Sequence, residues 1–212
     1  MTQAAPAPSA RKTELLELAY SYALTNGMGD LSLRPLAAAV GSSPRVLLFL
    51  FGSKDGLIRA LLARARADEL AMLDTLRRDH PDTDLAGAVT RVWRWLSESR
   101  HRNLLTVWVE AYAQSLVQPD GSWGEFARQT VTDWLDVLAQ YQPPRTRSTP
   151  AGAAQRTAAL AALRGALLDL LATSDQRRTT AAIRLQLKAI TTSAPRATTR
   201  RTAPKGQPHL PR

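Results

Sequence analysis

The sequence predicts an all-α protein: an N-terminal three-helix unit with a helix-turn-helix, followed by a C-terminal bundle of about five to six helices. Two observations lead to this class. Long runs rich in Ala, Leu and Arg place apolar residues three and four apart, without the alternation typical of strands. Residues 33–54 read as two short helices separated by a glycine-containing turn, which is the pattern of a helix-turn-helix.

Length and composition limit the functional classes. A chain of 212 residues is long enough for a sizeable core, and the absence of cysteine excludes disulfides and thiolate catalysis. No apolar run approaches the roughly 18 residues of a membrane span, and the N-terminus lacks the apolar core of a signal peptide. We therefore expect a cytoplasmic protein without a membrane partner.

The net charge of +10 is unevenly distributed. Residues 1–56 hold five basic and four acidic residues, whereas residues 195–212 hold five basic residues and no acidic one. A basic chain favours a polyanionic partner, because binding releases counterions. Half of this net charge nevertheless lies in the tail, away from the helix-turn-helix.

The first predicted segments are an arm and a helix. Residues 1–10 are rich in Ala, Pro, Ser and Thr and are expected to be disordered, either as a solvated terminus or as an arm that contacts DNA beside the main site. Residues 11–56 form the predicted DNA-binding domain. Its first helix, 11–26, carries an apolar stripe and ends before Gly27.

Capping residues define the next two helices. Ser32 is positioned to cap the first of them, and Gly41 follows it where a left-handed residue is wanted. Ser43 caps the second, over 44–51, with Pro44 at its first position. This second helix is the candidate for the DNA major groove.

A long linking helix follows and leads into the second domain. It extends to about residue 78, so that 57–80 link the domains, and the sequence His80-Pro81-Asp82 marks the boundary. Residues 81–191 form the predicted second domain, in which Gly165 suggests a close helix contact. Its expected helices cover 84–99, 101–117, 123–141, 153–173 and 175–191, with a mobile loop at 142–152 and a disordered basic tail at 192–212.

Residues 11–60 closely resemble the DNA-binding domain of the TetR family of bacterial transcriptional regulators. The string from Gly41 to Leu57 is the most specific part, with Gly41-Ser42-Ser43-Pro44 at its start and Phe51-Gly52-Ser53-Lys54 near its end. The resemblance implies a homodimer that binds a palindromic double-stranded DNA operator, usually as a repressor, and is released by a small-molecule effector. Residues 81–212 resemble the family in architecture only.

The candidate DNA contacts follow from this resemblance and from the chemistry of the side chains. They are Arg34, Ser42, Ser43, Pro44, Arg45, Leu48, Phe49 and Lys54. The sequence departs from the family at Leu48, where a Tyr is usual, and at Leu50, where a His is frequent. The alternative is therefore a ligand-binding dimer whose weakened reading helix acts through protein contacts.

Aromatic residues concentrate in the second domain, where they form either an effector pocket or the bundle core. The pocket candidates are Trp93, Trp108, Tyr112, Phe126 and Trp134. Glu110 and Asp133 lie on the same helices, either as partners of a cationic ligand or as solvated residues.

The resemblance also places a dimer interface in the last two helices. The candidates are Leu160, Leu163, Leu167, Leu170, Ile183 and Leu187. No catalytic motif, cofactor-binding motif or histidine pair with metal-ligand spacing is present in the sequence, so we expect neither an enzyme nor a cofactor or metal site.

Overall fold

The computed structural model describes residues 10–79 and 84–192, and all regular secondary structure in these ranges is helical. No described helix combines the length and apolar character needed to cross a bilayer. The elements are α1 (Ala10–Asn26), α2 (Leu33–Ala39), α3 (Pro44–Phe51), α4 (Lys54–Asp79), α5 (Leu85–Leu96), the 3₁₀ helix η1 (Ser99–His101), α6 (Arg102–Val117), α7 (Phe126–Gln140), α8 (Pro144–Arg147), α9 (Pro150–Thr173) and α10 (Gln176–Thr192).

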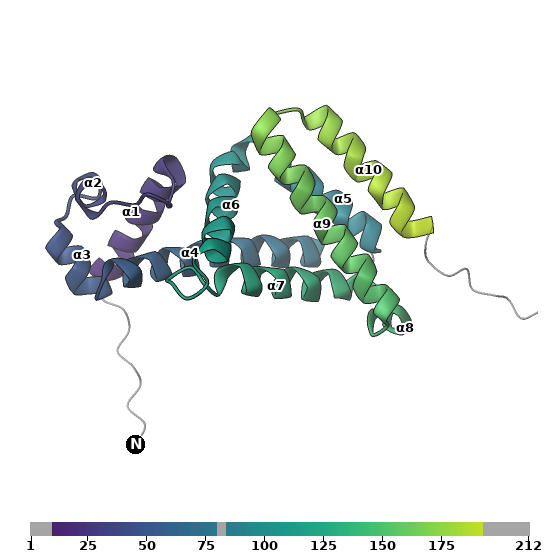
Figure 1. Cartoon of the computed structure of the whole chain (residues 1–212), viewed down its shortest axis with the longest axis horizontal. Helices are drawn as coiled ribbons and strands as arrows, with labels where there is room; N and C mark the ends of the chain where they lie inside the picture. The colour runs from purple at the N-terminus through teal and green to yellow at the C-terminus, as the bar shows by residue number, and fades with distance from the viewer. Residues whose placement is uncertain (1–9, 80–83, 193–212) are drawn as a thin grey trace, which may run out of the picture.

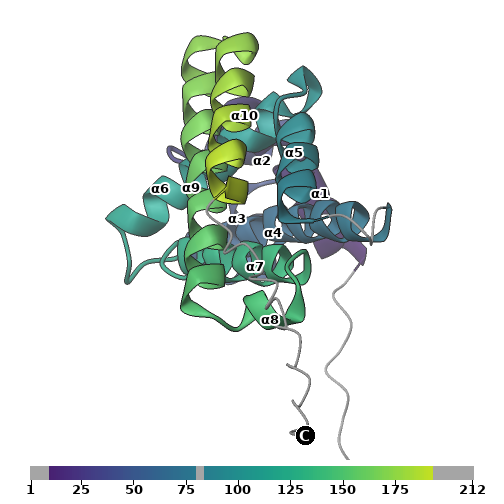
Figure 2. The same ribbon diagram turned by 90° about the vertical axis from the view of Figure 1, so that its right-hand side faces the viewer.

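The helices form a head and a bundle (Figure 1). The head consists of α1, α2 and α3 at one end of the molecule, and α4 extends from it along the base of the bundle. Helix α6 stands between the head and the bundle and contacts α1. Helices α9 and α10 pack side by side at the other end, as Figure 2 also shows. The architecture is the one that the sequence predicts.

Local sequence explains how α2 and α3 are held at an angle. Gly41 adopts a φ of 61° in the turn between them, a conformation that costs glycine little. The Ser43 hydroxyl accepts a hydrogen bond from Val46 N at 3.3 Å, so it caps α3 as predicted. Ser32 occupies the N-cap position of α2, but its side chain makes no capping hydrogen bond, so that part of the prediction is wrong.

Helix α4 joins the two parts through one continuous apolar core. Leu57 and Leu61 are fully buried beside Leu15 and Leu36 of the head in this cluster, and Leu73 belongs to it farther along α4. The bundle side includes Val89, Leu105, Leu138 and Leu163. A core shared across the junction limits independent movement of head and bundle.

The segment predicted as a mobile loop, 142–152, is an ordered connection. Pro144 begins the short helix α8, and α9 starts at Pro150 with the Thr149 hydroxyl accepting from Gly152 N at 3.0 Å. Buried Gln142 donates to Gly152 O at 3.1 Å. Prolines at first helical positions, rather than loop-forming prolines, explain the difference.

The predicted helix contact at Gly165 is not found, and three predicted segments lie outside the described residues. A Cβ at Gly165 would meet no described atom of this chain within 4 Å, so the predicted close contact is absent from the described fold. The arm at 1–9, the boundary at 80–83 and the tail from 193 lie outside the described residues.

Candidate functional site

Helix α3 presents one face to the core of the head and the other to solvent. Leu47 and Phe51 are buried, whereas Phe49 is 85% exposed. Arg45 and Leu48 are also exposed. Val46, Leu48 and Phe49 together give this face an exposed apolar patch, which indicates a contact surface.

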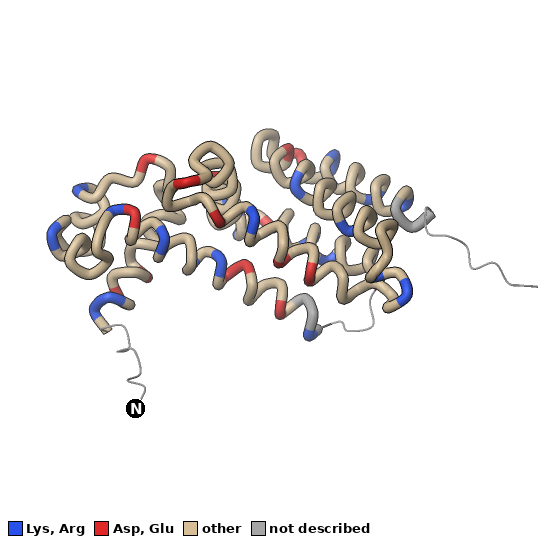
Figure 3. Tube along the Cα trace, turned by 60° about the horizontal axis from the view of Figure 1, so that its bottom comes forward, with Lys and Arg blue, Asp and Glu red and all other residues tan. Residues whose placement is uncertain are grey.

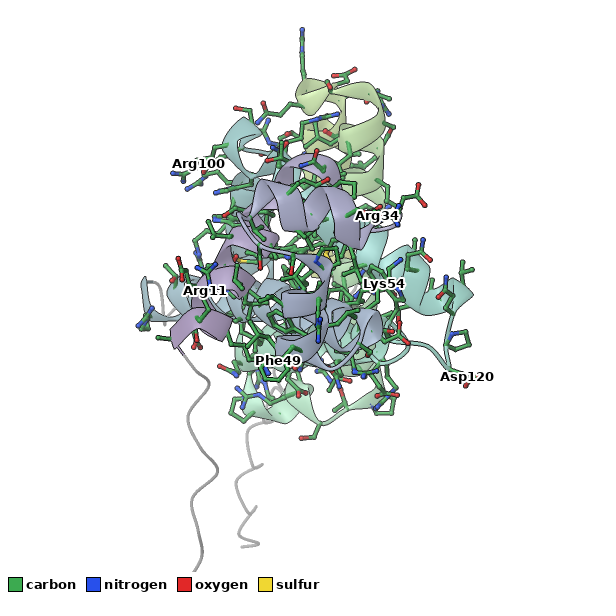
Figure 4. The ribbon with its side chains drawn as sticks, turned by 90° about the vertical axis from the view of Figure 1, so that its left-hand side faces the viewer. Arg11, Arg34, Phe49, Lys54, Arg100 and Asp120 are labelled. Atoms are coloured by element: carbon green, nitrogen blue, oxygen red, sulfur yellow. The ribbon has the colours of Figure 1, made fainter. Side chains whose placement is uncertain are left out.

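The other DNA candidates lie around α3. Figure 4 looks onto the end of the molecule that carries Arg34, Phe49 and Lys54, with Arg11 on the opposite side of Phe49 from Lys54. Arg34 and Lys54 are exposed, while Ser42 and Pro44 are half-buried in the turn. Lysine and arginine positions mark the outer end of the head in Figure 3. These cations can reach phosphate oxygens on either side of a groove-bound helix.

A cavity of about 310 Å³ lies among the helices of the bundle and is partly open to solvent, where Leu116 and Leu168 are exposed. Its walls are almost entirely apolar, and helices α4, α5, α6, α7 and α9 all contribute to them. The lining residues are Glu69, Leu96, Trp108, Val109, Tyr112, Ala113, Leu116, Phe126, Thr130, Trp134, Leu160, Leu163, Arg164, Leu167 and Leu168. A concave apolar space with a few polar groups is the usual form of a small-molecule site.

Glu69 of α4 is the buried acid in this wall, with 2% of its surface exposed. Its Oε1 accepts from Trp134 Nε1 at 2.5 Å, and the Thr130 hydroxyl lies 3.4 Å from Oε2. Burial raises the pKa of Glu69, because a carboxylate loses its hydration there, although the Trp134 hydrogen bond acts in the opposite direction. Both oxygens therefore already have partners from α7.

Arg164 of α9 is the basic group in the wall. Its guanidinium carbon lies 4.8 Å from the centroid of the Tyr112 ring, and Nη1 donates to the Tyr112 hydroxyl at 3.3 Å. Nη2 is buried and has no hydrogen-bond partner among the described residues. Desolvation lowers the pKa of Arg164, but a guanidinium stays charged at neutral pH.

Four of the five aromatic pocket candidates line the cavity: Trp108, Tyr112, Phe126 and Trp134. Trp93 does not; it is buried, and its Nε1 donates to the Thr180 hydroxyl at 2.9 Å, joining α5 to α10. Its assignment to the pocket is therefore corrected to a place in the core.

Sequence reasoning missed the two charged residues of the cavity. A usable signal was present in each case, because a charge interrupts an apolar helix stripe. Glu69 lies between Ala65 and Leu73 on the inner side of α4, and Arg164 lies between Leu160 and Leu168 on α9.

Glu110 joins the bundle to the head. Its Oε2 accepts from Met28 N at 2.6 Å and its Oε1 from Gly29 N at 2.7 Å, so one carboxylate of α6 binds the turn between α1 and α2. A Cβ at Gly29 would lie 2.5 Å from Oε1, so a larger residue there would displace the Glu110 carboxylate from this position. We call this arrangement of Glu110, Met28 and Gly29 the α6 clamp.

Neither acid that the sequence offered as a partner for a cationic ligand lines the cavity. Glu110 belongs to the α6 clamp. Asp133 of α7 forms an ion pair with Arg66 of α4, with Arg66 Nη2 2.7 Å from Asp133 Oδ2. Both acids are thus used by contacts between helices, in place of the ligand or solvent contacts expected.

The residues predicted for a dimer interface face this chain's own interior. Leu160, Leu163 and Leu167 line the cavity, and Leu170 and Ile183 are also buried, while Leu187 is half-buried. Among the described side chains of α9 and α10, the exposed large apolar ones are Leu168, at 52% and in the cavity wall, and Leu185, at 69%. Leu185 lies outside the predicted set, and the dimer interface itself stays a prediction.

Comparisons with known proteins identify the fold. No protein-family model and no curated protein sequence matches the chain. Among solved structures, a transcriptional regulator from Rhodococcus sp. Rha1 superimposes with a TM-score of 0.68 at 20% identity, over 85% of this chain and 96% of that one.

Two further structures give the same result. The multidrug binding protein EbrR, complexed with imidazole, gives a TM-score of 0.60 at 23% identity, over 84% of this chain and 90% of EbrR. A TetR-like transcriptional regulator from Rhodococcus sp. RHA1 gives 0.57 at 18% identity, over 88% and 96% of the two chains. The chain therefore has the all-α fold of TetR-type regulators, as the resemblance of residues 11–60 implied.

Proposed function

We propose that the chain is a ligand-responsive transcriptional regulator that binds DNA through α3 and a small-molecule effector in the cavity of the bundle. The observation that carries this proposal is the α6 clamp. The same helix that supplies Trp108 and Tyr112 to the cavity holds the head through Glu110. A ligand that moves α6 thus acts directly on the orientation of the head.

The DNA complex is a homodimer on a palindromic operator. Each protomer places α3 in the major groove, in half-sites about one helical turn, or 34 Å, apart. Arg45 is the candidate for contact with a guanine or a phosphate, and Phe49 for contact with a thymine methyl. Arg34 and Lys54 contact flanking phosphates, and the Ser43 hydroxyl, engaged as the cap of α3, orients the helix rather than reading bases.

The regulator acts as a cytoplasmic repressor in this proposal, and it catalyses no reaction. Without ligand, the clamp holds the heads at a separation that fits the two half-sites. An effector between α6, α7 and α9 favours another position of α6, so the heads no longer match the operator and the DNA is released.

Selection from random-sequence DNA tests the proposal. The full chain is incubated with a pool of random duplexes at fixed salt, and bound DNA is sequenced after several rounds. We expect an enriched inverted repeat with half-site centres one turn apart. A pool that remains unenriched, or one that is enriched without two-fold symmetry, contradicts the proposal.

One observation favours a second candidate function. The exposed face of α3 is apolar at Val46, Leu48 and Phe49, where a DNA-reading helix usually carries polar groups. In this alternative the chain binds a ligand but acts through a protein that contacts α3. This alternative predicts that the DNA selection leaves the pool unenriched. It also predicts that Phe49→Ala abolishes binding of the partner protein.

A further inference from the structure

The cavity has an uneven set of hydrogen-bonding groups. Its acid, Glu69, is fully engaged by Trp134 and Thr130. Its donors are not. Trp108 is 8% exposed, and its buried Nε1 has no hydrogen-bond acceptor among the described residues. The buried Nη2 of Arg164 is in the same condition.

Unpaired buried donors are costly; Trp108 and Arg164 carry those of the cavity wall, and others lie on Arg91, Tyr141 and Arg156 away from it. A buried N–H without an acceptor loses its hydration and gains nothing in return, and the cost is greater for a charged group. Trp108 and Arg164 both belong to the wall of one apolar cavity, on α6 and α9. A ligand in the cavity that carries an acceptor group can supply a partner to either nitrogen when the side chain turns toward it.

The charge of the cavity defines that acceptor further. Among the described residues Arg164 forms no ion pair: it contacts the ring and hydroxyl of Tyr112, and Glu69 acts on it by a Coulombic interaction without a direct contact. Glu69 has a raised pKa and two hydrogen-bond donors already directed at it, so it offers little to a cation. Nη2 of Arg164 is therefore the charged donor of the cavity wall that lacks a partner, and its complement is an anionic acceptor.

We propose that the effector is a flat apolar carboxylate, whose carboxylate binds Arg164 and whose ring system packs among Trp108, Tyr112, Phe126 and Trp134. This inference rests on the proposed function, of which it specifies the ligand. The guanidinium offers its unpaired Nη2 to the carboxylate as a charge-assisted donor, while Nη1 is held by the Tyr112 hydroxyl. Trp108 Nε1 donates to an acceptor of the bound ligand.

Calorimetric titration of the full chain with three matched probes tests the inference. The probes are 2-naphthoate, 2-naphthamide and 2-naphthylmethylamine, which share a ring system but are anionic, neutral and cationic. We expect the anion to bind roughly tenfold or more tightly than the amide, as a charge-assisted hydrogen bond requires. The cation binds no better than the amide.

Two variants place the effect in the cavity. Arg164→Gln removes the charge and reduces the affinity for 2-naphthoate to that for the amide. Arg128→Gln, at an exposed arginine of α7 that does not line the cavity, leaves all three affinities unchanged. Thermal unfolding of each variant confirms that it is folded at the titration temperature.

Three outcomes overturn the inference. They are equal affinities for anion and amide, tightest binding of the cation with loss on Glu69→Gln, and no binding of any probe at millimolar concentration. These titrations contain no DNA, so a negative result in them is independent of the result of the DNA selection. Symmetric DNA enrichment without carboxylate binding rejects the ligand class and leaves the regulator.

Discussion

Two glutamates have opposite roles at the scale of single residues. Glu69 is buried in the cavity wall, where desolvation raises its pKa. Glu110 is half-buried, and its carboxylate accepts two backbone hydrogen bonds. Apolar walls favour the neutral form of the Glu69 carboxyl group, whereas the Glu110 carboxylate holds the α1–α2 turn.

Glu69 makes the stability of the protein depend on pH. Its folded pKa lies above the unfolded value, so its contribution is fully present below the unfolded pKa and is lost as the pH rises through the folded pKa. A difference of one between the folded and unfolded pKa corresponds to about 1.4 kcal/mol. Asp133 raises the pKa of Glu69 further and Arg66 lowers it, since both charges act on the same carboxyl group.

Glu69→Gln should therefore remove this pH dependence. The amide can still accept from Trp134 Nε1, but it has no proton to lose. In urea unfolding from about pH 4 to pH 8, the free energy of unfolding of the variant should rise relative to wild type as the pH increases. Two parallel pH curves would contradict the assignment.

At the scale of elements, α6 is the part that connects ligand and DNA sites. Trp108, Glu110 and Tyr112 occupy one short stretch of it, so the helix faces the cavity and the head within little more than one turn. Helix α4 also joins head and bundle, through the apolar core, but α6 holds the α1–α2 turn by hydrogen bonds. Loss of those bonds should loosen the head without unfolding the bundle.

Gly29→Ala and Glu110→Gln test the clamp from its two sides. The added Cβ displaces the Glu110 carboxylate, and the amide leaves one backbone N–H without an acceptor. We expect the Met28 amide, the Gly29 amide or both to exchange with solvent roughly tenfold faster in Glu110→Gln, and the Met28 amide to do so in Gly29→Ala, as loss of a charged hydrogen bond implies. Glu125→Gln, at an exposed acid, is the control; unchanged exchange of these amides in both clamp variants would refute the clamp.

The sequence predicts these elements better than it predicts the cavity. The cap at Ser43, the proline at Pro44 and the positive φ of Gly41 are all local features, so the local sequence is sufficient to predict α3. The places of Trp93 and Glu69 depend on distant hydrogen-bond partners: Thr180 is 87 positions from Trp93, and Trp134 is 65 positions from Glu69. No local pattern distinguishes a core tryptophan from a cavity tryptophan, because both lie on the inner face of a helix.

At the scale of the whole molecule, the proposal requires two chains. The exposed Leu185 of α10, the helix that packs beside α9, makes this end the best candidate for the interface. The predicted set around Leu163 lies inside the chain instead, where a charge would disturb the cavity and the fold. The interface thus remains a prediction, now centred on the outer face.

Leu185→Glu should separate the dimer. The side chain is 69% exposed in one chain, so the substitution leaves the fold of the protomer intact but places a charge in the proposed interface. Light scattering after gel filtration should report a monomer. Val117→Glu, at a side chain that is 75% exposed at the end of α6, should remain dimeric. A dimeric Leu185→Glu protein would place the interface elsewhere.

The central claim is that α3 reads DNA, and the affinity of the full chain for DNA flanking its own gene tests it most directly. Arg45 follows Pro44 at the start of α3, and Arg145 follows Pro144 at the start of α8, on the far side of the bundle, so Arg145→Ala is a matched control (Figure 1). At fixed salt, Arg45→Ala should weaken binding roughly tenfold or more, the effect of losing a base or phosphate contact, while Arg145→Ala should not. Weak binding that is the same for unrelated DNA sequences and is unchanged by Arg45→Ala would contradict this claim.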